Sequence, residues 1–498
     1  MRYDGTGRGH SWSASRLLVL CCACGPHRGP AGASESDTSA AAEGASASGA
    51  STSDAPAADL GGAKRAVALE WVATIRGTVP GQRLGVQVEF GGDHDGDGIE
   101  DLLVGQAGGQ AYVFFGGAFA TDAVQPPDQP LQAGKTLRLP GYVNYASAGD
   151  FDGDGLPDVV LVAARTGQWD LNRLYVVHSD PGDSLVEVVE GSDKIALISE
   201  STTQAELGLP RDDDYPRTLS FADIDGDGRD DLIASRLFRV FIVEGVPRGS
   251  MPGSIDDANV GIAGKALAAS GGSVLGLPRL PDDEIGHLAV DGTRLFVVPD
   301  DLPSGSGCGE GGPCLPMFTG PYWPGYPIAY AASSDRSQRR FATGTSLGSP
   351  STAVRLFPGL DHVGEGSDAF AEIFGGQPDW YRPDPGRPEP FVLGFSIAFV
   401  GDLNADGIPD LAMSSRHPTT AIVALSAPDG GSTDLSEALR TGDAAQVYGV
   451  EGDDFGWQLA AGRDVTGDGT PDLVVGAPSD ADGSAPGGAV YIYSITYE

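Results

Sequence analysis

Basic residues are scarce in this sequence: 31 lysines and arginines stand against 69 aspartates and glutamates, and the formal net charge is -38. Nucleic acids and anionic membrane surfaces are bound through lysine and arginine, so this balance excludes both as partners. We expect a cationic partner instead.

Long apolar runs are also missing, because no stretch approaches 18 apolar residues and no transmembrane helix is expected. Any membrane attachment would therefore use a lipid. Basic residues precede a short apolar run over residues 17–23, which ends at Cys24 and resembles a bacterial lipobox. We interpret residues 1–24 as an export leader with lipidation at Cys24. The chain would then be an exported lipoprotein, anchored at the cell surface or in the periplasm. The alternative is a disordered leader with incidental cysteines.

Cysteine is rare outside this leader, where Cys308 and Cys314 form the remaining pair in a glycine-rich segment. Their spacing permits a small disulfide loop, which an oxidising compartment would close. A zinc site is the alternative, but it would need two more cysteines or histidines nearby, and the seven histidines are scattered.

Large hydrophobic residues are nearly absent from residues 25–64, which are rich in alanine, serine and glycine. Such a segment cannot bury a core, so we predict a disordered linker there. The folded domain should occupy residues 65–498. The 74 glycines and 36 prolines of the chain favour short strands joined by turns, as in an all-β protein.

A nine-residue acidic pattern, D-x-[DNT]-x-D-G-x-x-D, occurs five times in that domain, starting at Asp93, Asp150, Asp223, Asp402 and Asp464. Calcium takes six to eight oxygen ligands, which alternate side chains can supply while glycines let the chain wrap the ion. Position 7 varies freely, as a backbone carbonyl ligand allows. We predict about five calcium sites with these ligands: Asp93, Asp95, Asp97, Ile99 and Asp101; Asp150, Asp152, Asp154, Leu156 and Asp158; Asp223, Asp225, Asp227, Arg229 and Asp231; Asp402, Asn404, Asp406, Ile408 and Asp410; Asp464, Thr466, Asp468, Thr470 and Asp472.

Two other interpretations of these loops are weaker. An EF-hand would place a glutamate at position 12 and helices on both sides, whereas an apolar, strand-like run follows each loop here. A single copy could be a solvated Asp-Gly turn, but five copies in one frame argue against that.

Seven apolar strands repeat at a similar place in units of roughly 60 residues, starting at Ala111, Arg173, Arg239, Arg294, Ala353, Ala421 and Ala489. Seven such units with about four strands each predict a seven-bladed β-propeller, whose closed ring removes exposed sheet edges. Two units, the fourth and the fifth, lack the acidic pattern. The segment from Arg65 should pair with the last unit and close the ring.

The last unit resembles the FG-GAP repeat of integrin α subunits, because Phe455-Gly456, the loop from Asp464 and Gly476-Ala477-Pro478 follow in order. Leu84-Gly85 and Leu393-Gly394 repeat the first element less closely. The resemblance implies that the calcium loops brace one face of a propeller and that ligands bind on the opposite face. It covers about residues 65–498.

A binding role is favoured over catalysis, with a protein or glycan at the cell surface as ligand. Ser346 lies in a Gly-x-Ser-x-Gly match, but between two predicted strands rather than at a strand-to-helix turn. The alternative is a carbohydrate-active propeller, a lectin or a polysaccharide lyase. Candidate ligand contacts in the calcium-free units are Trp323, Tyr326, Trp380 and Arg382, although such aromatic residues could equally pack under irregular loops.

Overall fold

The computed structural model describes most of residues 65–498. The described ranges are 65–107, 110–119, 133–138, 142–164, 172–180, 184–187, 195–199, 218–236, 239–250, 274–277, 286–290, 294–298, 315–319, 328–331, 339–344, 353–358, 371–375, 393–416, 419–426, 431–450, 452–480 and 487–498. The chain divides into two units, Met1–Leu60 and Gly61–Glu498. The predicted leader with Cys24 and nearly all of the predicted linker lie in the first unit, outside the described residues.

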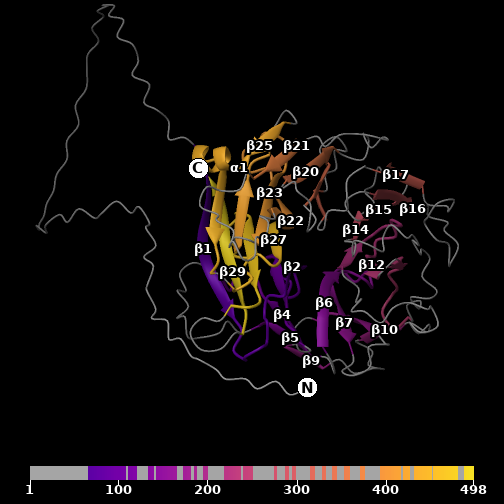
Figure 1. Ribbon diagram of the computed structural model, residues 1–498. Coiled ribbons are helices and arrows are strands. Elements are labelled where there is room, and N and C mark those ends of the chain that lie inside the picture. The colour runs from indigo at the N-terminus through magenta and orange to yellow at the C-terminus, as the bar shows by residue number, and fades with distance from the viewer. Residues whose placement is uncertain are drawn as a thin grey trace, which may run out of the picture. The chain divides into compact units, whose positions relative to one another are not determined.

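The described strands form seven sheets, numbered here by the order of their first strands (Figure 1). Short strands alternate with glycine-rich turns, as the composition predicts, and nearly all pairings are antiparallel. The first three sheets are β2 (Gln87–Gly92), β3 (Asp101–Gly105), β4 (Gln110–Phe114), β5 (Lys135–Arg138) and β9 (Leu185–Glu187); β6 (Tyr142–Gly149), β7 (Asp158–Ala164), β8 (Asn172–Val177) and β10 (Ile195–Ser199); β11 (Thr218–Ala222), β12 (Asp231–Arg236) and β13 (Arg239–Val243).

The fourth to seventh sheets continue the same order along the chain. They are β14 (Val274–Leu277), β15 (Gly286–Val290), β16 (Arg294–Val298) and β17 (Leu315–Thr319); β18 (Ile328–Ala331), β19 (Arg340–Thr343), β20 (Ala353–Pro358), β21 (Ala371–Phe374) and β25 (Ser432–Asp434); β22 (Leu393–Gly401), β23 (Asp410–Arg416), β24 (Thr419–Ala424) and β26 (Ala444–Tyr448); β27 (Leu459–Arg463), β28 (Asp472–Ala477), β29 (Ala489–Tyr497) and β1 (Val67–Arg76).

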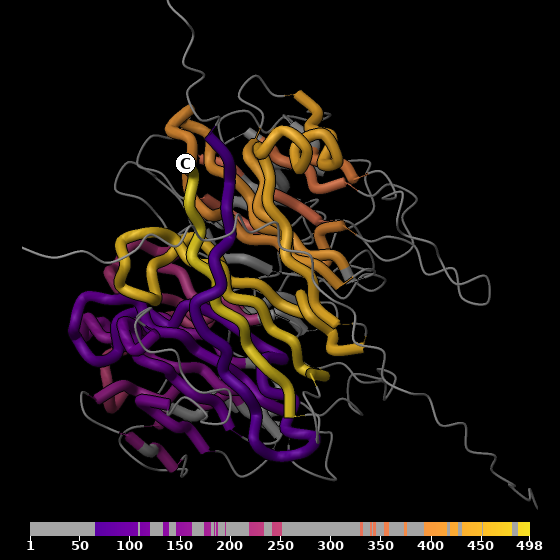
Figure 2. Tube along the Cα trace, turned by 90° about the vertical axis from the view of Figure 1, so that its left-hand side faces the viewer, coloured from indigo at the N-terminus to yellow at the C-terminus, as the bar shows by residue number. Residues whose placement is uncertain are grey.

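The seven strands predicted from the repeat are all present, and each is the third strand of its sheet: β4, β8, β13, β16, β20, β24 and β29. The prediction for the segment after Arg65 is also confirmed, because β1 pairs antiparallel with β29 and places Ile75 opposite Val490. Figure 2 shows β1, in indigo, running beside the yellow C-terminal strand. The two ends of the described chain therefore share the seventh sheet.

Successive sheets contact one another through their first strands. The contacts run from β2 to β6, β11, β14, β18, β22 and β27 in chain order, and β27 contacts β2 again. Within the second unit, the contacts between first strands therefore pass through all seven sheets and return to β2.

The central strands are apolar on both sides, because each sheet packs between two neighbours. Val159 and Leu161 of β7 lie in a core cluster with Leu103 of the first sheet. Val160 points to the opposite side, as strand geometry requires, and lies in a cluster with Leu232 of the third sheet. Burying such a side chain contributes about 1.5–3 kcal/mol. This packing explains why continuous apolar runs follow the acidic loops.

One α-helix appears among the described residues, α1 (Leu435–Thr441), which the sequence pattern did not predict. The Asp434 carboxylate accepts hydrogen bonds from the backbone N–H groups of Ser436 and Glu437 and caps its first turn. Gly442 ends it in a left-handed conformation, with φ of 87°. Leu435 and the neighbouring apolar face pack into the core cluster between the fifth and sixth sheets.

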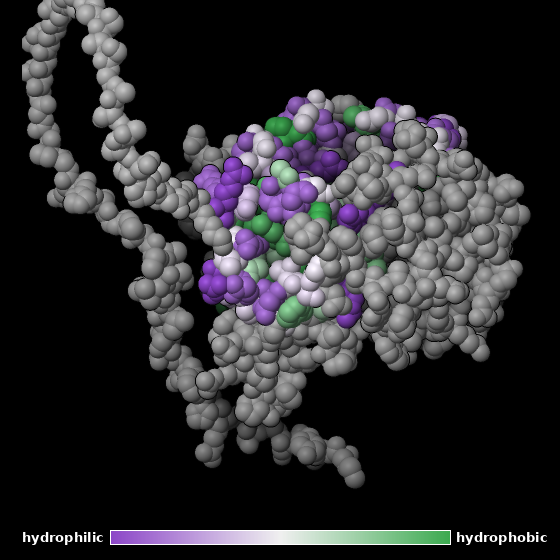
Figure 3. Space-filling model, turned by 90° about the horizontal axis from the view of Figure 1, so that it is seen from above, coloured by the Kyte–Doolittle hydropathy of each residue, from purple (hydrophilic) through white to green (hydrophobic). Residues whose placement is uncertain are grey.

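On the face seen in Figure 3, the coloured residues are mostly hydrophilic, with small hydrophobic areas between them. Among the described residues, the exposed large hydrophobic side chains are Trp71, Val79, Phe374, Tyr448 and Val450. No helix in the described ranges is long and apolar enough to cross a membrane.

Candidate metal centres

Each acidic loop joins the first strand of a sheet to the second. The loops follow β2, β6, β11, β22 and β27, in the first, second, third, sixth and seventh sheets. This strand-loop-strand arrangement is the predicted one and differs from an EF-hand. The ninth residue of each pattern is also the first residue of the following strand: Asp101, Asp158, Asp231, Asp410 and Asp472.

The first aspartate of each loop organises the turn through backbone hydrogen bonds. In the first loop, the Asp93 carboxylate accepts from the N–H groups of Gly96 at 2.7 Å, Asp97 at 3.1 Å and Gly98 at 2.8 Å. Gly96 and Gly98 have φ values of 81° and 87°, which glycine adopts without strain. The fourth loop has Ala405 at the first of these glycine positions and holds it at φ 60°. The common backbone shape is therefore kept even where the sequence departs from glycine.

The ninth aspartate of each loop is fully buried, with an exposure of at most 2% in all five loops. In the sixth sheet, the Asp410 carboxylate accepts from the N–H groups of Leu403 at 2.9 Å and Ser426 at 2.8 Å. Burial, together with the nearby charges of Asp406 and Asp402, raises the pKa of Asp410 to about 7 despite these hydrogen bonds. A buried carboxylate of this kind fits a bound cation, because a positive ion would compensate its charge.

Carboxylate oxygens converge most closely in the first three loops. In the described ranges, groups of three acidic oxygens within 4.8 Å of one another come from Asp93, Asp95 and Asp101; from Asp150, Asp152 and Asp154; and from Asp223, Asp225 and Asp227. The fourth and fifth loops have Asn404 and Thr466 where these loops have a carboxylate at position 3. An oxygen-lined cluster of this kind suits a hard cation such as calcium.

Position 7 is not inert in every loop, although sequence reasoning treated its side chain as free to vary. In the third loop, the Arg229 guanidinium forms an ion pair with Asp227 and donates from Nε to the Gly245 carbonyl at 2.9 Å. In the fifth loop, Thr470 Oγ1 donates to Asp468 Oδ1 at 2.6 Å. These partners occupy position-5 carboxylates that the predicted metal ion would need.

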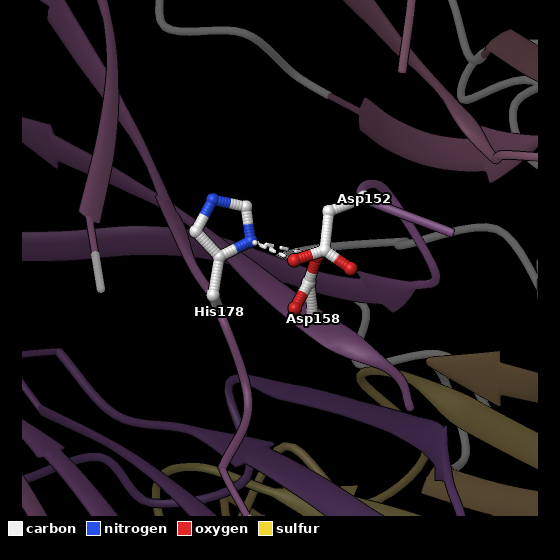
Figure 4. A group of neighbouring side chains, drawn as sticks. All are labelled: Asp152, Asp158 and His178. Carbon is white, nitrogen blue, oxygen red and sulfur yellow. Dashed lines mark hydrogen bonds and ion pairs between the residues drawn. The ribbon is translucent and has the colours of Figure 1, made fainter. Parts of the chain in front are cut away.

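The second loop contains a histidine that sequence reasoning missed. His178 follows β8 directly, and its Nδ1 lies 3.1 Å from Oδ2 of both Asp152 and Asp158 (Figure 4). Burial lowers the pKa of His178, but the hydrogen bond that His178 donates to Asp158 and the charges of both aspartates outweigh burial and raise it. The signal in the sequence was a histidine placed 20 residues after Asp158, which only the strand pairing makes meaningful.

The phenylalanine and glycine of the last unit have a structural role. Phe455 is buried and packs edge to face on Tyr491, with ring centroids 5.4 Å apart. Gly456 has a φ of 84°, and a Cβ there would lie 2.9 Å from Cβ of Ser414 in the sixth sheet. The motif therefore fixes the contact between neighbouring sheets and not the metal ligands.

Several predicted site residues lie outside the described residues and stay predictions. They are Cys24, Cys308, Cys314, Trp323, Tyr326, Trp380 and Arg382.

Comparison with known families matches two parts of the chain. Residues 455–493 match the FG-GAP repeat, and residues 93–161 match the FG-GAP-like repeat. The first match contains the loop of the seventh sheet, and the second contains the loops of the first two sheets. The chain carries an FG-GAP, integrin-like propeller.

Two curated relatives agree with this assignment. The propeller chain is 35% identical to integrin alpha-7 of Rattus norvegicus over 91 residues, and 34% identical to integrin alpha-7 of Mus musculus over 89 residues. Each alignment covers 18% of this chain and 8% or 7% of the integrin. The matched segment is therefore a small part of both proteins.

Solved structures resemble the propeller chain over most of its length but distantly. A chain from the crystal structure of BBS1N in complex with ARL6DN, soaked with mercury, has a TM-score of 0.43 at 9% identity, covering 86% of this chain and 96% of that chain. The Pan2 WD40 domain of Neurospora crassa has a TM-score of 0.41 at 9% identity, covering 87% and 96%.

Proposed function

We propose that this protein is a calcium-stabilised, seven-bladed propeller that works outside the cytoplasm as a binding or adhesion module for a protein or a glycan. The observation that carries the proposal is the five acidic loops, each with a buried carboxylate at the start of the second strand of its sheet. A buried anion without a compensating cation costs several kcal/mol. Calcium would supply that cation at five places.

The seven-bladed ring is supported by the contacts between first strands, which pass through the seven sheets in chain order and return from β27 to β2. It is also supported by β1, which completes the seventh sheet beside β29. Sharing one sheet between the two ends of a domain closes a ring without exposed edges.

Calcium would be held by the side chains of positions 1, 3, 5 and 9, with the carbonyl of position 7. Its charge would compensate the converging carboxylates and fix each loop against its sheet. Five ions would bring the formal charge from -38 to about -28. We infer a structural role for these ions, because the acidic side chains are occupied by their own loops.

The experiment that tests calcium binding is thermal unfolding of the full chain in excess calcium and in excess chelator. Each independent site adds about 2.7 kcal/mol when calcium is at 100 times its dissociation constant, so chelation should lower the melting temperature by many degrees. An unchanged melting temperature would refute the proposal.

The binding role is supported by the integrin-like repeats, and we place the contacts on Trp323, Tyr326, Trp380 and Arg382. A calcium-dependent screen against glycans and proteins identifies the ligand. Trp323→Ala and Trp380→Ala should then weaken binding and leave the melting temperature nearly unchanged. If these residues pack in the core instead, both substitutions should destabilise the fold by several kcal/mol. Cleavage products from a polysaccharide would favour the lyase alternative over a lectin.

We further propose that Cys24 carries a lipid that tethers the domain to the membrane through residues 25–64. The apolar run before Cys24 and the composition after it motivate this proposal.

A further inference from the structure

The second acidic loop differs from the other four in how its ninth aspartate is bound. In the first, third, fourth and fifth loops, one oxygen of that aspartate accepts the backbone N–H of loop position 2 at 2.7–3.1 Å. In the second loop, the corresponding N–H of Phe151 donates to the Gly149 carbonyl at 3.0 Å. The freed oxygen, Asp158 Oδ2, lies 3.1 Å from His178 Nδ1 instead.

The third position of this loop is also unlike its counterparts. Asp152 is buried, with 1% of its side chain exposed, whereas Asp95 and Asp225 are exposed at the same position. Its Oδ1 accepts the N–H of Asp154 at 3.2 Å, and its Oδ2 is turned toward His178. Among the described residues, Asp152 Oδ2 accepts no hydrogen bond, since the single Nδ1 proton of an imidazole can be directed to only one of the two aspartates.

One nitrogen and two carboxylate oxygens of buried residues therefore lie within 4.8 Å of one another (Figure 4). Calcium binds oxygen ligands, whereas imidazole is a ligand of zinc and of other divalent transition metals. Two ligands of a tetrahedral zinc ion are about 3.3 Å apart, which follows from metal–ligand distances of about 2.0–2.1 Å. The 3.1 Å separations between His178 Nδ1 and the two oxygens are close to that value.

We propose that the second loop binds a divalent transition metal of the zinc class through Asp152, Asp158 and His178, in preference to calcium. This inference rests on and deepens the metal-binding part of the proposed function, because it replaces calcium in the second loop and leaves calcium in the other four. The ion would join the loop after β6 to the end of β8. It would also affect the first loop, because Ser179 Oγ, next to His178, lies 2.9 Å from Nδ1 of His94.

The other sheets that carry an acidic loop suggest a matched substitution for the test. The N–H groups that reach the other oxygen of the ninth aspartate belong to Gly116, Ser179, Gly245 and Ser426 in the first, second, third and sixth sheets. The residue before Ser426 is Leu425, so Leu425 is the counterpart of His178. His178→Leu therefore installs the side chain that the sixth sheet already has beside its own acidic loop.

The experiment is equilibrium dialysis of the full chain against buffered zinc in excess calcium, with both metals counted by mass spectrometry. The wild type should retain one zinc more than His178→Leu, and the zinc affinity of the second loop should fall by at least about 10-fold, since even an outer-shell partner is worth that much. Cobalt should give visible absorption bands without thiolate charge transfer, which separates this site from the cysteines. Asp152→Asn should lose the same zinc ion, because it removes the buried ligand oxygen that accepts no hydrogen bond from any described residue, and it keeps the test available if His178→Leu fails to fold.

Equal zinc retention by the wild type and His178→Leu would overturn the inference, as would complete displacement of zinc by calcium in the wild type. Failure of the calcium proposal would be seen in a different experiment, thermal unfolding, as a melting temperature that chelation does not change.

Discussion

Replacing Asp410 by asparagine should remove the stability that calcium adds at its loop and stabilise the protein in chelator. The side chain is fully buried at the start of β23, where no solvent reaches the carboxylate. The two conditions separate its role as a metal ligand from its role as a hydrogen-bond acceptor.

The magnitude in chelator follows from two opposing effects. Burial raises the pKa of Asp410 to about 7, roughly three units above its usual value, so the ionised form costs about 4 kcal/mol at pH 8. Asparagine removes this cost. It also loses one acceptor, because its amide nitrogen cannot accept the N–H of Leu403, at a cost of about 1–3 kcal/mol. The net change in chelator at pH 8 should therefore be a stabilisation of about 1–3 kcal/mol.

In excess calcium the same substitution removes a charged ligand. The stability that calcium adds at this site, about 2.7 kcal/mol if calcium is present at 100 times its dissociation constant, should be lost. Thermal unfolding followed by circular dichroism in both conditions measures the difference. Asp434→Ala is the control, because it removes the cap of α1 and should cost about 0.5–2 kcal/mol with or without calcium. Equal destabilisation by Asp410→Asn in both conditions would refute a metal at this loop.

Four further outcomes are expected. In chelator, stability should fall as pH rises from about 4 to 7, because burial raises the pKa of Asp231, Asp410 and Asp472 to about 7 and their protonated forms favour the fold. A melting temperature that increases with pH over this range would contradict this. Gly456→Ala should cost more than Gly452→Ala, since both have positive φ but a Cβ at Gly452 meets no atom within 4 Å, and chemical denaturation measures the gap; equal costs would remove the role given to the sheet contact. The loop from Asp464, which has Thr466 in place of a carboxylate, should lose calcium first. At a chelator concentration that empties one site of the wild type, Asp464→Ala should therefore retain as many calcium ions as the wild type, whereas Asp93→Ala should retain one fewer. Cys24→Ser should move the protein from the membrane to the soluble fraction, and a variant that stays membrane-bound, with Cys21 and Cys22 also excluded, would exclude the lipid.

The acidic loops could be located from the sequence because their geometry is local. Asp93 binds the N–H groups of residues three to five positions later, and the glycines that allow this turn are part of the same nine residues. The strands after the loops could be predicted from the sequence equally well, since packing between two sheets requires apolar side chains on both faces. The pairing of β1 with β29 followed from counting strands in the repeat.

Other features depend on strand pairing that no local pattern encodes. The short strand β9 follows the second sheet's third strand in the chain but adds in parallel to β5 of the first sheet. Helix α1 occupies a connection that the strand repeat does not describe. Its caps, Asp434 and Gly442, are local, whereas the burial of Leu435 depends on the neighbouring sheets.

The sequence by itself determined where five acidic loops lie and that seven similar strand units surround them, because both are repeated within short, contiguous segments. The tertiary structure alone decided what else faces each loop. His178 reaches Asp152 and Asp158 only because β7 and β8 pair in a register that places Val177 opposite Val159. Arg229 reaches the Gly245 carbonyl because β12 and β13 pair in the third sheet. Such contacts join residues that are distant in the chain, so their geometry is fixed by the pairing of whole strands and not by the residues on either side.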